Sequence, residues 1–343
     1  MTVSRLYLQC VRCGGGGYPA DGVLGTDVGV SKGARRMACL AGSVQSFAAA
    51  SRLLDELAGW TLSDESIRRA CYREAAGVAD FEARSPAAAA PFGKAKGAVE
   101  FQTDAAKVNT TGGWRDMKIG VFAKRPEGLP STPEELERRH LPAPSVRVGF
   151  AAIEGIEAFG PKWGEGMKRL GIAAPASVSV LGDGAEWIWN QARESFPGAT
   201  QVLDFYHASE HLADAAKLLF GEGTEAARQW HSAMRGRLLA DGWHGVCEGI
   251  GQTLAEENTP ARQQALEGLT AYLANHSERI NYALRLHQGR SIGSGMIEGA
   301  AKNLVGKRMK QTGARWKVEN ANKMARLCCL EYSELWNAYW LAL

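Results

Sequence analysis

The segment Ser177-Val-Ser-Val-Leu-Gly-Asp183-Gly184 decides the fold of this chain. Its apolar run is short and is followed at once by turn residues, which is typical of a buried strand. A helical pattern with Trp187, Ile188 and Trp189 comes next, and Thr200-Gln-Val-Leu203 predicts another strand of the same kind. Strand, helix, strand and helix in succession indicate parallel strands that are covered by helices.

Further strand patterns precede this segment, whereas the stretch behind it is helical. Residues 97–104, 114–122 and 147–153 are short β-rich runs separated by Gly and Pro turns, and a three-stranded meander is the simplest account of them. Residues 208–290 carry no strand signal and are expected to be all-helical. From residue 296 to the C-terminus the pattern is helical again.

The composition excludes several classes of protein. The chain has 343 residues, of which 45% are hydrophobic and 22% charged, so we expect a folded core and neither a disordered nor a fibrous chain. No apolar run reaches the length of about 18 residues that a membrane span needs, and residues 1–13 lack the apolar core of a secretory signal. We therefore expect a cytoplasmic protein with no membrane partner.

The seven cysteines are odd in number and indicate no disulfide framework. Cys10-Val-Arg-Cys13 differs from the others, because a Cys-x-x-Cys turn that continues into glycines has the form of one zinc knuckle. A tetrahedral Zn²⁺ site needs a second pair, and none follows at the spacing of a zinc ribbon. Half of a zinc knuckle and an incidental cysteine pair therefore both stay open.

Two helical patterns precede the first strand. One covers residues 46–57, and the other starts behind an N-cap at Ser63, with a break at Gly59-Trp-Thr61 between them. Helix, short turn and a helix with Ile67-Arg-Arg69 fit a helix-turn-helix DNA reader and fit any other helical hairpin equally well. Residues 79–96, which contain Pro86, Pro91, Gly93 and several alanines, are interpreted as a linker.

Three carboxylates occupy positions that suit a ligand site. Asp104 ends one predicted strand and Asp183 follows another, at the edge where open α/β sheets bind their ligands, so both can face one point. Glu298 follows a glycine-rich turn, near the start of a predicted helix. The alternatives are structural: Asp-Gly is ordinary turn chemistry, and a glutamate in a first helical turn complements the helix dipole.

A strongly basic segment lies directly behind Glu298. Residues 302–326 contain eight basic residues and one acidic residue, a net charge of +7 within a chain whose formal charge is +3. Such a surface neutralises backbone phosphates, while three carboxylates hold two Mg²⁺ or Mn²⁺ ions. Trp316 is expected to stack on an unpaired base. The expected DNA contacts are Lys302, Lys307, Arg308, Lys310, Arg315, Trp316 and Lys317.

With these residues the chain resembles the DDE transposases of bacterial insertion sequences, most closely the Kra-type group, which is related to the Mutator-like transposases. The motifs that carry the resemblance are Asp104, Gly182-Asp183-Gly184, Leu203-Asp204-Phe-Tyr-His207 and Gly295-Met-Ile-Glu298 with the basic segment behind it. Ala105 stands where the family usually has glycine. Because only one half of the expected zinc knuckle is found, we expect an N-terminally truncated copy.

The resemblance implies an α/β, RNase H-like catalytic core, which is a mixed five-stranded sheet flanked by helices. Asp104 on the first strand, Asp183 after the fourth and Glu298 on a late helix would be the catalytic metal ligands, and Asp204 and His207 would be auxiliary residues. The expected divisions are a glycine-rich arm (1–40), a helix-turn-helix-like region with a linker (41–96), the core (97–207), an all-helical insertion (208–290) and a C-terminal segment with the catalytic glutamate (291–343).

The resemblance also implies an activity and partners. The expected reaction is metal-dependent phosphodiester hydrolysis at transposon ends, followed by strand transfer into target DNA. The expected partners are double-stranded DNA and further copies of the chain, as a homodimer or a larger oligomer on DNA at the nucleoid.

Two other functions stay open. The segment His207-Ala-Ser-Glu210-His211 matches the His-x-x-Glu-His pattern of a zinc peptidase, with Glu210 as general base, but this explains neither Asp183 nor the basic segment. A DNA-binding protein without catalysis, either a regulator or a decayed transposase, would need the basic segment and not the three carboxylates.

Overall fold

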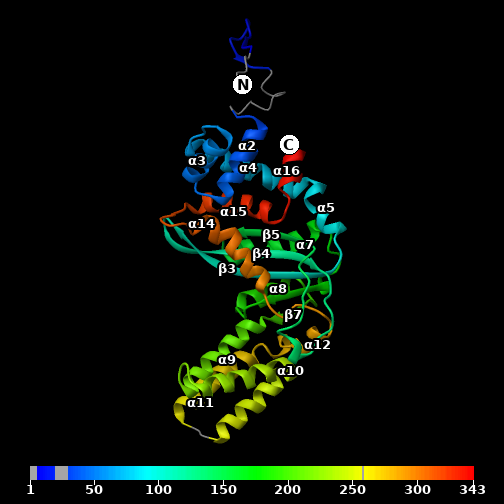
Figure 1. Ribbon diagram of the computed structural model, residues 1–343. Helices are drawn as coiled ribbons and strands as arrows, with labels where there is room; N and C mark the ends of the chain where they lie inside the picture. Colours follow the sequence, from blue (N-terminus) through cyan, green and yellow to red (C-terminus); the bar gives the residue numbers. More distant parts are fainter. Residues whose placement is uncertain (1–5, 20–29, 257–258) are drawn as a thin grey trace.

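A mixed five-stranded β-sheet forms the centre of the computed structural model, which describes residues 6–19, 30–256 and 259–343 (Figure 1). The strand order is β5-β4-β3-β6-β7. Helices flank the sheet, so the expected α/β architecture with a mixed sheet is confirmed. The strands are β3 (Ala98–Thr110), β4 (Gly113–Arg125), β5 (Val146–Ala152), β6 (Val178–Gly182) and β7 (Thr200–Leu203).

The first three of these strands form the expected antiparallel meander. The β3–β4 hairpin is longer than the sequence indicated, because pairing extends from Ala98 opposite Arg125 to Thr110 opposite Gly113. Gly113 has a φ of 95°, which a glycine adopts without strain in this tight turn. β6 runs parallel to β3, and the chain reaches it from β5 through two helices; β7 runs parallel to β6, and one helix connects these two strands.

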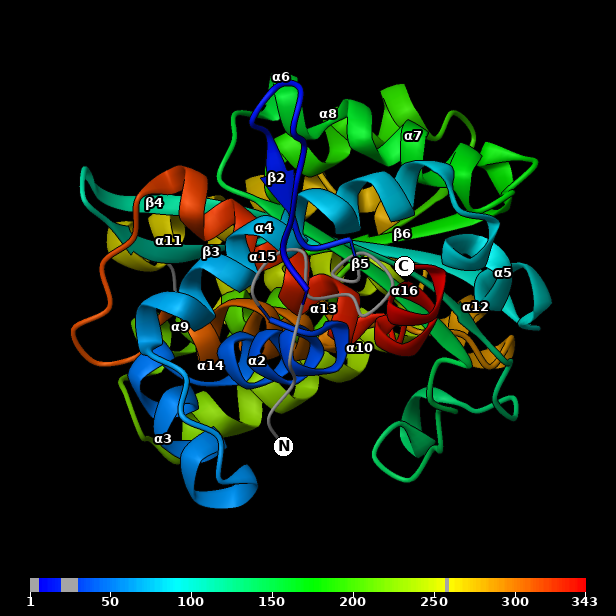
Figure 2. The same cartoon turned by 90° about the horizontal axis from the view of Figure 1, so that it is seen from above.

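Side-chain alternation along the strands separates two apolar cores. On one face, Phe101 and Phe122 pack with Trp163 and Phe196 under the helices that connect β5, β6 and β7. Figure 2 shows α6, α7 and α8 grouped along this side. The connecting elements are η1 (Pro133–Glu135), α6 (Ile156–Phe159), α7 (Pro161–Arg169), η2 (Pro175–Ser177) and α8 (Glu186–Ser195).

The opposite face of the sheet is covered by the N-terminal and C-terminal helices. Met117 and Ile119 of β4 belong to an apolar cluster with Ile297 and Leu304. The C-terminal elements are α13 (Gly295–Ala300), the π-helical η4 (Ala301–Gly306), α14 (Lys307–Met309), α15 (Val318–Tyr332) and α16 (Trp336–Ala342).

Two of the N-terminal helices, at Phe47–Ala58 and from Asp64 onward, match the predicted helical patterns up to residue 78, whereas the helix Lys32–Val44 was not predicted, since residues 1–40 were interpreted as an arm. The N-terminal helices are α2 (Lys32–Val44), α3 (Phe47–Ala58), α4 (Asp64–Arg84) and α5 (Pro86–Lys94), and Ser63 caps α4 as expected. The linker expected at 79–96 is wrong, because α4 continues to Arg84 and α5 covers most of the rest. Proline at the first position of a helix costs no hydrogen bond, and the alanines behind Pro86 favour the helix.

The glycine-rich arm is described only in part, since residues 1–5 and 20–29 lie outside the described residues. The described part contains a short hairpin of β1 (Leu8–Gln9) and β2 (Gly16–Gly17). Cys10 and Cys13 lie in its turn, and both thiols are free and exposed.

The predicted insertion is helical in its described residues. It contains α9 (Phe205–Phe220), α10 (Glu225–Glu256), α11 (Pro260–Ala274), η3 (Ser277–Arg279) and α12 (Tyr282–His287), with a kink in α10 at Gly242. α9, α10 and α11 lie at one end of the molecule and α2 to α4 at the other (Figure 1). In the described part of the chain, no helix is both long and apolar enough to cross a membrane.

Candidate active site

Asp104 lies on β3 in a neighbourhood of other carboxylates. Burial raises the pKa of its carboxyl group above the ordinary value, and the negative charges of Asp183 and Glu298 raise it further. The backbone N–H of Ala105, which donates to Asp104 Oδ1 at 2.6 Å, and the His207 side chain both lower this pKa. The register of β3 and β6 and the hydrogen bonds that hold α13 explain why both charges act on Asp104.

The register of the sheet explains why Asp183 lies near Asp104. Gln102 of β3 is opposite Leu181 of β6 in the parallel pair, so two residues further along each strand Asp104 comes level with Asp183. Asp183 stands just beyond the end of β6, where its Oδ1 accepts the backbone N–H of Ala185 at 3.0 Å. Both aspartates are half-buried.

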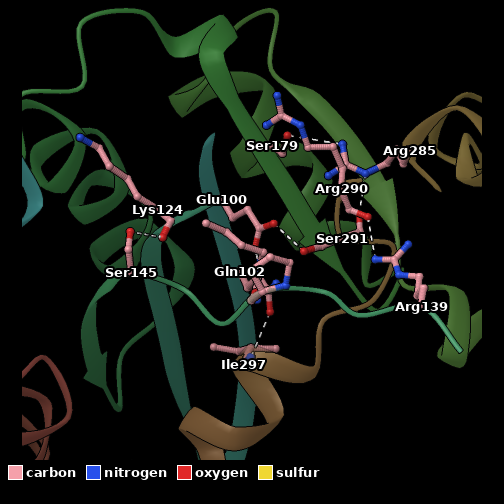
Figure 3. Close-up of polar contacts among 12 residues, drawn as sticks. Glu100, Gln102, Lys124, Arg139, Ser145, Ser179, Arg285, Arg290, Ser291 and Ile297 are labelled. Atoms are coloured by element: carbon pink, nitrogen blue, oxygen red, sulfur yellow. Dashed lines mark hydrogen bonds and ion pairs between the residues drawn. The ribbon is translucent and has the colours of Figure 1, made fainter. Parts of the chain in front are cut away.

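Glu298 reaches this place because two side chains hold the start of its helix, α13. Asp204 Oδ2 accepts the backbone N–H of Ser294 at 2.7 Å and also the Ser294 hydroxyl. Gln102 Oε1 accepts the backbone N–H of Ile297 at 3.0 Å (Figure 3). Glu298 itself is exposed, as a side chain that meets a ligand from solvent needs to be.

Asp204 is a buried positioning residue. Its Oδ1 accepts the backbone N–H groups of Tyr206 at 2.6 Å and His207 at 3.1 Å, which makes it the N-cap of α9. Asp204 therefore accepts four hydrogen bonds, two of them from Ser294, and so connects α9 to α13. This suits the auxiliary part that the sequence suggested, since the carboxylate is occupied by protein donors.

His207 lies on the first turn of α9 and is half-buried. Its Nδ1 is 3.4 Å from Glu210 Oε2, and its ring makes an edge contact with His211 at 5.0 Å between centroids. His211 in turn stacks on Tyr272 at 3.9 Å. Within the peptidase pattern, His207 thus contacts both Glu210 and His211, and His211 connects the pattern to Tyr272.

No local pattern in the sequence indicates the contribution of Tyr272. This residue belongs to α11, 89 residues from Asp183, and its hydroxyl donates to the Asp183 carbonyl oxygen at 3.2 Å. Burial and the charge of Asp183 raise the pKa of its phenol. His276 lies beside Tyr272, and burial together with the charge of Arg279 lowers its pKa to about 4. A neutral imidazole and a neutral phenol therefore border the acidic site near neutral pH.

A buried polar network supports the segment that leads to α13. Glu100 of β3 accepts the hydroxyl of Ser291 at 2.5 Å (Figure 3). It also accepts Arg125 Nε at 3.1 Å. The Nε of Arg285 donates to the Ser291 carbonyl oxygen at 2.6 Å. Burial lowers the pKa of Arg285 to about 10, and the negative charge of Glu100 opposes this. The network fixes the strand of Asp104 to the chain that enters α13.

The expected DNA contacts divide into exposed and buried residues. Arg308 and Trp316 are buried, so we no longer assign them to DNA binding. Arg308 Nε donates to the Gly42 carbonyl oxygen at 2.6 Å, and its guanidinium lies 4.9 Å from the Trp316 ring centroid. Trp316 Nε1 donates to the Met309 carbonyl oxygen. The exposed residues of the set are Lys302, Lys307, Lys310, Arg315 and Lys317.

Within residues 6–19, 30–256 and 259–343, no group of three or more His, Cys, Asp and Glu side chains is arranged to hold a metal ion. At the N-terminal hairpin, backbone N–H groups of Arg12 and Cys13 lower the pKa of the Cys10 thiol. The zinc prediction for Cys10 and Cys13 stays a prediction.

Comparison with known proteins does not assign the chain to a family. No family model matches the sequence. No curated protein matches it at a significant level. The function of this chain therefore has to be inferred from its own residues and their arrangement.

Proposed function

We propose that the chain is a DNA transposase of the DDE type, with Asp104, Asp183 and Glu298 as its catalytic carboxylates. The observation that carries the proposal is geometric: the parallel register of β3 and β6 brings Asp104 level with Asp183, and the hydrogen bond from Ile297 to Gln102 holds the helix of Glu298 against β3. The strand order supports the RNase H-like interpretation, because three antiparallel strands are followed by two parallel strands beside the first one.

The donor chemistry at this site fits Mg²⁺ or Mn²⁺. Carboxylate oxygens are the ligands that Mg²⁺ prefers, and carboxylates that repel one another gain stability from a bound cation. Asp104, Asp183 and Glu298 would hold the ions. When bound, two such ions activate the attacking oxygen and stabilise the leaving oxygen of a phosphodiester.

The other residues of the site position these ligands. Asp204 and Gln102 fix the start of α13 and so the direction of Glu298. Tyr272 fixes the backbone at Asp183. The exposed residues Lys302, Lys307, Lys310, Arg315 and Lys317 would neutralise DNA phosphates next to this point, which favours binding of any DNA sequence.

The DNA-binding role of α2 to α4 belongs to the same proposal. Ser63 caps α4, and Arg68 and Arg69 on its first turns both form ion pairs with Glu65. These exposed pairs are weak, so DNA phosphates can compete with Glu65 for the arginines. Because two transposon ends have to be joined, the active form would be a dimer or a larger assembly on DNA.

The test is strand cleavage of a supercoiled plasmid that carries the DNA flanking both sides of the gene. We expect nicking with Mg²⁺ or Mn²⁺ by the wild-type chain and a loss of at least a hundredfold in Asp183→Asn and Glu298→Gln, by analogy with the loss of a catalytic group. Asp214→Asn is the matched control, because Asp214 is an exposed carboxylate paired with Lys217.

The outcomes separate the proposal from its main alternative. If the wild-type chain binds this DNA with both metals present and never nicks it, the chain is a DNA-binding protein without catalysis. If Asp183→Asn and Glu298→Gln cleave as fast as the wild type, the three carboxylates are not catalytic and the proposal is wrong.

A further inference from the structure

The β3–β4 hairpin extends beyond the other strands of the sheet (Figure 2). β5 pairs with β4 only from Lys118 to Lys124, so the β4 edge at residues 113–117 has no strand beside it. Trp114 lies on this free part and is 64% exposed. All ten tryptophans belong to the described residues, and the other nine are buried or half-buried. An indole exposed to this extent has apolar surface available for a ligand.

A groove of about 460 Å³ lies along this edge, and Trp114, Arg115, Lys118 and Val318 are among its lining residues. Two acids also line it, but each has a lysine partner: Asp116 Oδ1 lies 2.8 Å from Lys107 Nζ, and Glu154 Oε2 lies 2.5 Å from Lys162 Nζ.

Arg115 supplies a positive charge at the groove that has no acidic partner in the described part of the chain. Within residues 6–19, 30–256 and 259–343, Arg115 forms no ion pair. The groove therefore combines an aromatic face with a positive charge that no carboxylate neutralises.

Part of the basic segment is joined to the same hairpin. The Trp316 backbone N–H donates to Asn109 at 3.0 Å, and its carbonyl oxygen accepts the N–H of Thr111 at 2.8 Å. Asn109 is the residue opposite Trp114. These bonds place the exposed Arg315 and Lys317 beside the tip that carries Trp114, so further positive charge lies next to the groove.

We propose that this groove binds an unpaired nucleotide of a DNA strand, with its base stacked on Trp114 and its phosphate near Arg115. The choice of DNA as the polymer rests on the proposed function. Stacking on an indole is tolerant of sequence and contributes strongly to single-strand binding. Base stacking was expected of Trp316, but Trp316 is buried and Trp114 is exposed. We therefore assign the stacking to Trp114.

The groove lies further along the same hairpin than Asp104. Asn109 lies five residues beyond Asp104, which is about 17 Å along β3. About five nucleotide steps of a B-form strand span the same length. Asn109 is an odd number of positions from Asp104, so Trp114 lies on the other face of the hairpin from Asp104, and a strand held at Trp114 would pass around the free β4 edge toward the carboxylates.

The experiment measures DNA binding by fluorescence anisotropy in EDTA, where no cleavage takes place. One DNA is a blunt duplex, and the other is the same duplex with a single-stranded extension that contains 2-aminopurine. We expect Trp114→Ala to weaken binding of the extended DNA by about tenfold and to leave the blunt duplex unchanged. Trp114→Phe should restore most of the affinity. The fluorescence of 2-aminopurine should be quenched when residue 114 is aromatic and not when it is alanine.

Two further variants make the result specific. Arg115→Gln should reduce the salt dependence of binding to the extended DNA, because one phosphate contact is lost. Leu129→Ala, at a side chain that is 85% exposed, is the control for general loss of apolar surface and should bind like the wild type. The Trp114 side chain is exposed at the tip of the hairpin, so circular dichroism should show the same fold in all variants.

The proposal is overturned if Trp114→Ala binds both DNAs like the wild type, or if it weakens both by the same factor. It is also overturned if 2-aminopurine fluorescence does not depend on residue 114. The plasmid assay separates this result from the proposed function: selective binding by Trp114 in a chain that never nicks DNA would leave the groove assigned and the transposase proposal wrong.

Discussion

Gln102 and Ile297 are 195 residues apart in the sequence, yet the side-chain amide oxygen of Gln102 accepts the backbone N–H of Ile297 at 3.0 Å. Gln102 precedes Asp104 by two residues and shares its face of β3, while Ile297 immediately precedes Glu298. One hydrogen bond therefore fixes the distance between the strand of the first carboxylate and the helix of the third.

Replacing Gln102 with methionine should lower activity more than stability. Methionine has a similar volume but no acceptor, so α13 loses one of its two side-chain anchors. The buried Gln102 Nε2 has no partner, and its removal offsets part of the loss, so we expect the free energy of unfolding to change by less than about 1 kcal/mol. The kcat for nicking should fall about tenfold with an unchanged KM for DNA.

The control for this prediction is Gln263→Met, since Gln263 is exposed on α11. Urea unfolding and plasmid nicking would be measured on both variants. A fall in stability that fully accounts for the lost activity, or a higher KM with unchanged kcat, would show that Gln102 does not position the helix of Glu298.

Asp104→Asn should stabilise the folded chain near neutral pH. Burial and the charges of Asp183 and Glu298 raise the folded-state pKa of Asp104, so the ionised wild-type side chain costs stability above that raised pKa. Below the unfolded-state pKa of about 3.9 the carboxyl is protonated in both states and the cost disappears. Asparagine has no charge and keeps an acceptor for the N–H of Ala105.

The measurement is the Tm of Asp104→Asn and wild type as a function of pH. We expect the variant to have the higher Tm at pH 7 and the difference to shrink as the pH falls through the raised pKa. A variant that is less stable than wild type at pH 7, or a difference that does not depend on pH, would show that the carboxylates do not repel one another.

Asp204→Ala should destabilise the protein by about 3 kcal/mol. The change removes the N-cap of α9 and leaves the buried N–H groups of Tyr206, His207 and Ser294 without their acceptor. Urea unfolding gives the free energy directly. Asp214→Ala, which removes an exposed carboxylate paired with Lys217, should cost no more than about 0.5 kcal/mol, and equal effects of the two changes would refute the assignment.

Gly184 and Tyr272 should be coupled in a double-mutant cycle. Gly184 has a φ of 101°, and a Cβ at this position would lie 2.6 Å from the Tyr272 hydroxyl. Gly184→Ala should cost about 2 kcal/mol from backbone strain and this clash. Tyr272→Phe should cost about 1 kcal/mol, because its hydrogen bond to Asp183 is lost.

The double variant should be more stable than the sum of the two single effects predicts, since phenylalanine removes the atom that alanine meets. The coupling is read from the free energies of unfolding of the four proteins. Additive effects would mean that α11 does not contact the Asp183 turn in solution.

The sequence predicted most of the sheet and little of what surrounds the carboxylates. Short apolar runs between Gly and Pro turns have one strong interpretation, so all five strands were expected at nearly their observed places. The proline-rich and alanine-rich stretch at 79–96 was misread, because Pro86 starts a helix as readily as it ends one.

Side-chain contacts across long separations carry no local signal. Nothing near Tyr272 in the sequence indicates that its hydroxyl reaches Asp183, and Gln102 looks like any polar residue of a strand. Charge counting placed Arg308 and Trp316 on the DNA surface, but the count does not say which way a side chain points. Their contacts with Gly42 and Met309 fill the space beneath the basic segment.

The three carboxylates leave the ribosome in a fixed order, and the last of them comes late. Two aspartates and the whole helical insertion are synthesised before Glu298, and α13 is anchored only when Ser294 and Ile297 meet Asp204 and Gln102. A nascent chain that stops before residue 294 thus contains all five strands of the sheet and no complete group of the three carboxylates. The group of three carboxylates therefore forms only after residue 294 and the residues behind it have been added to the chain.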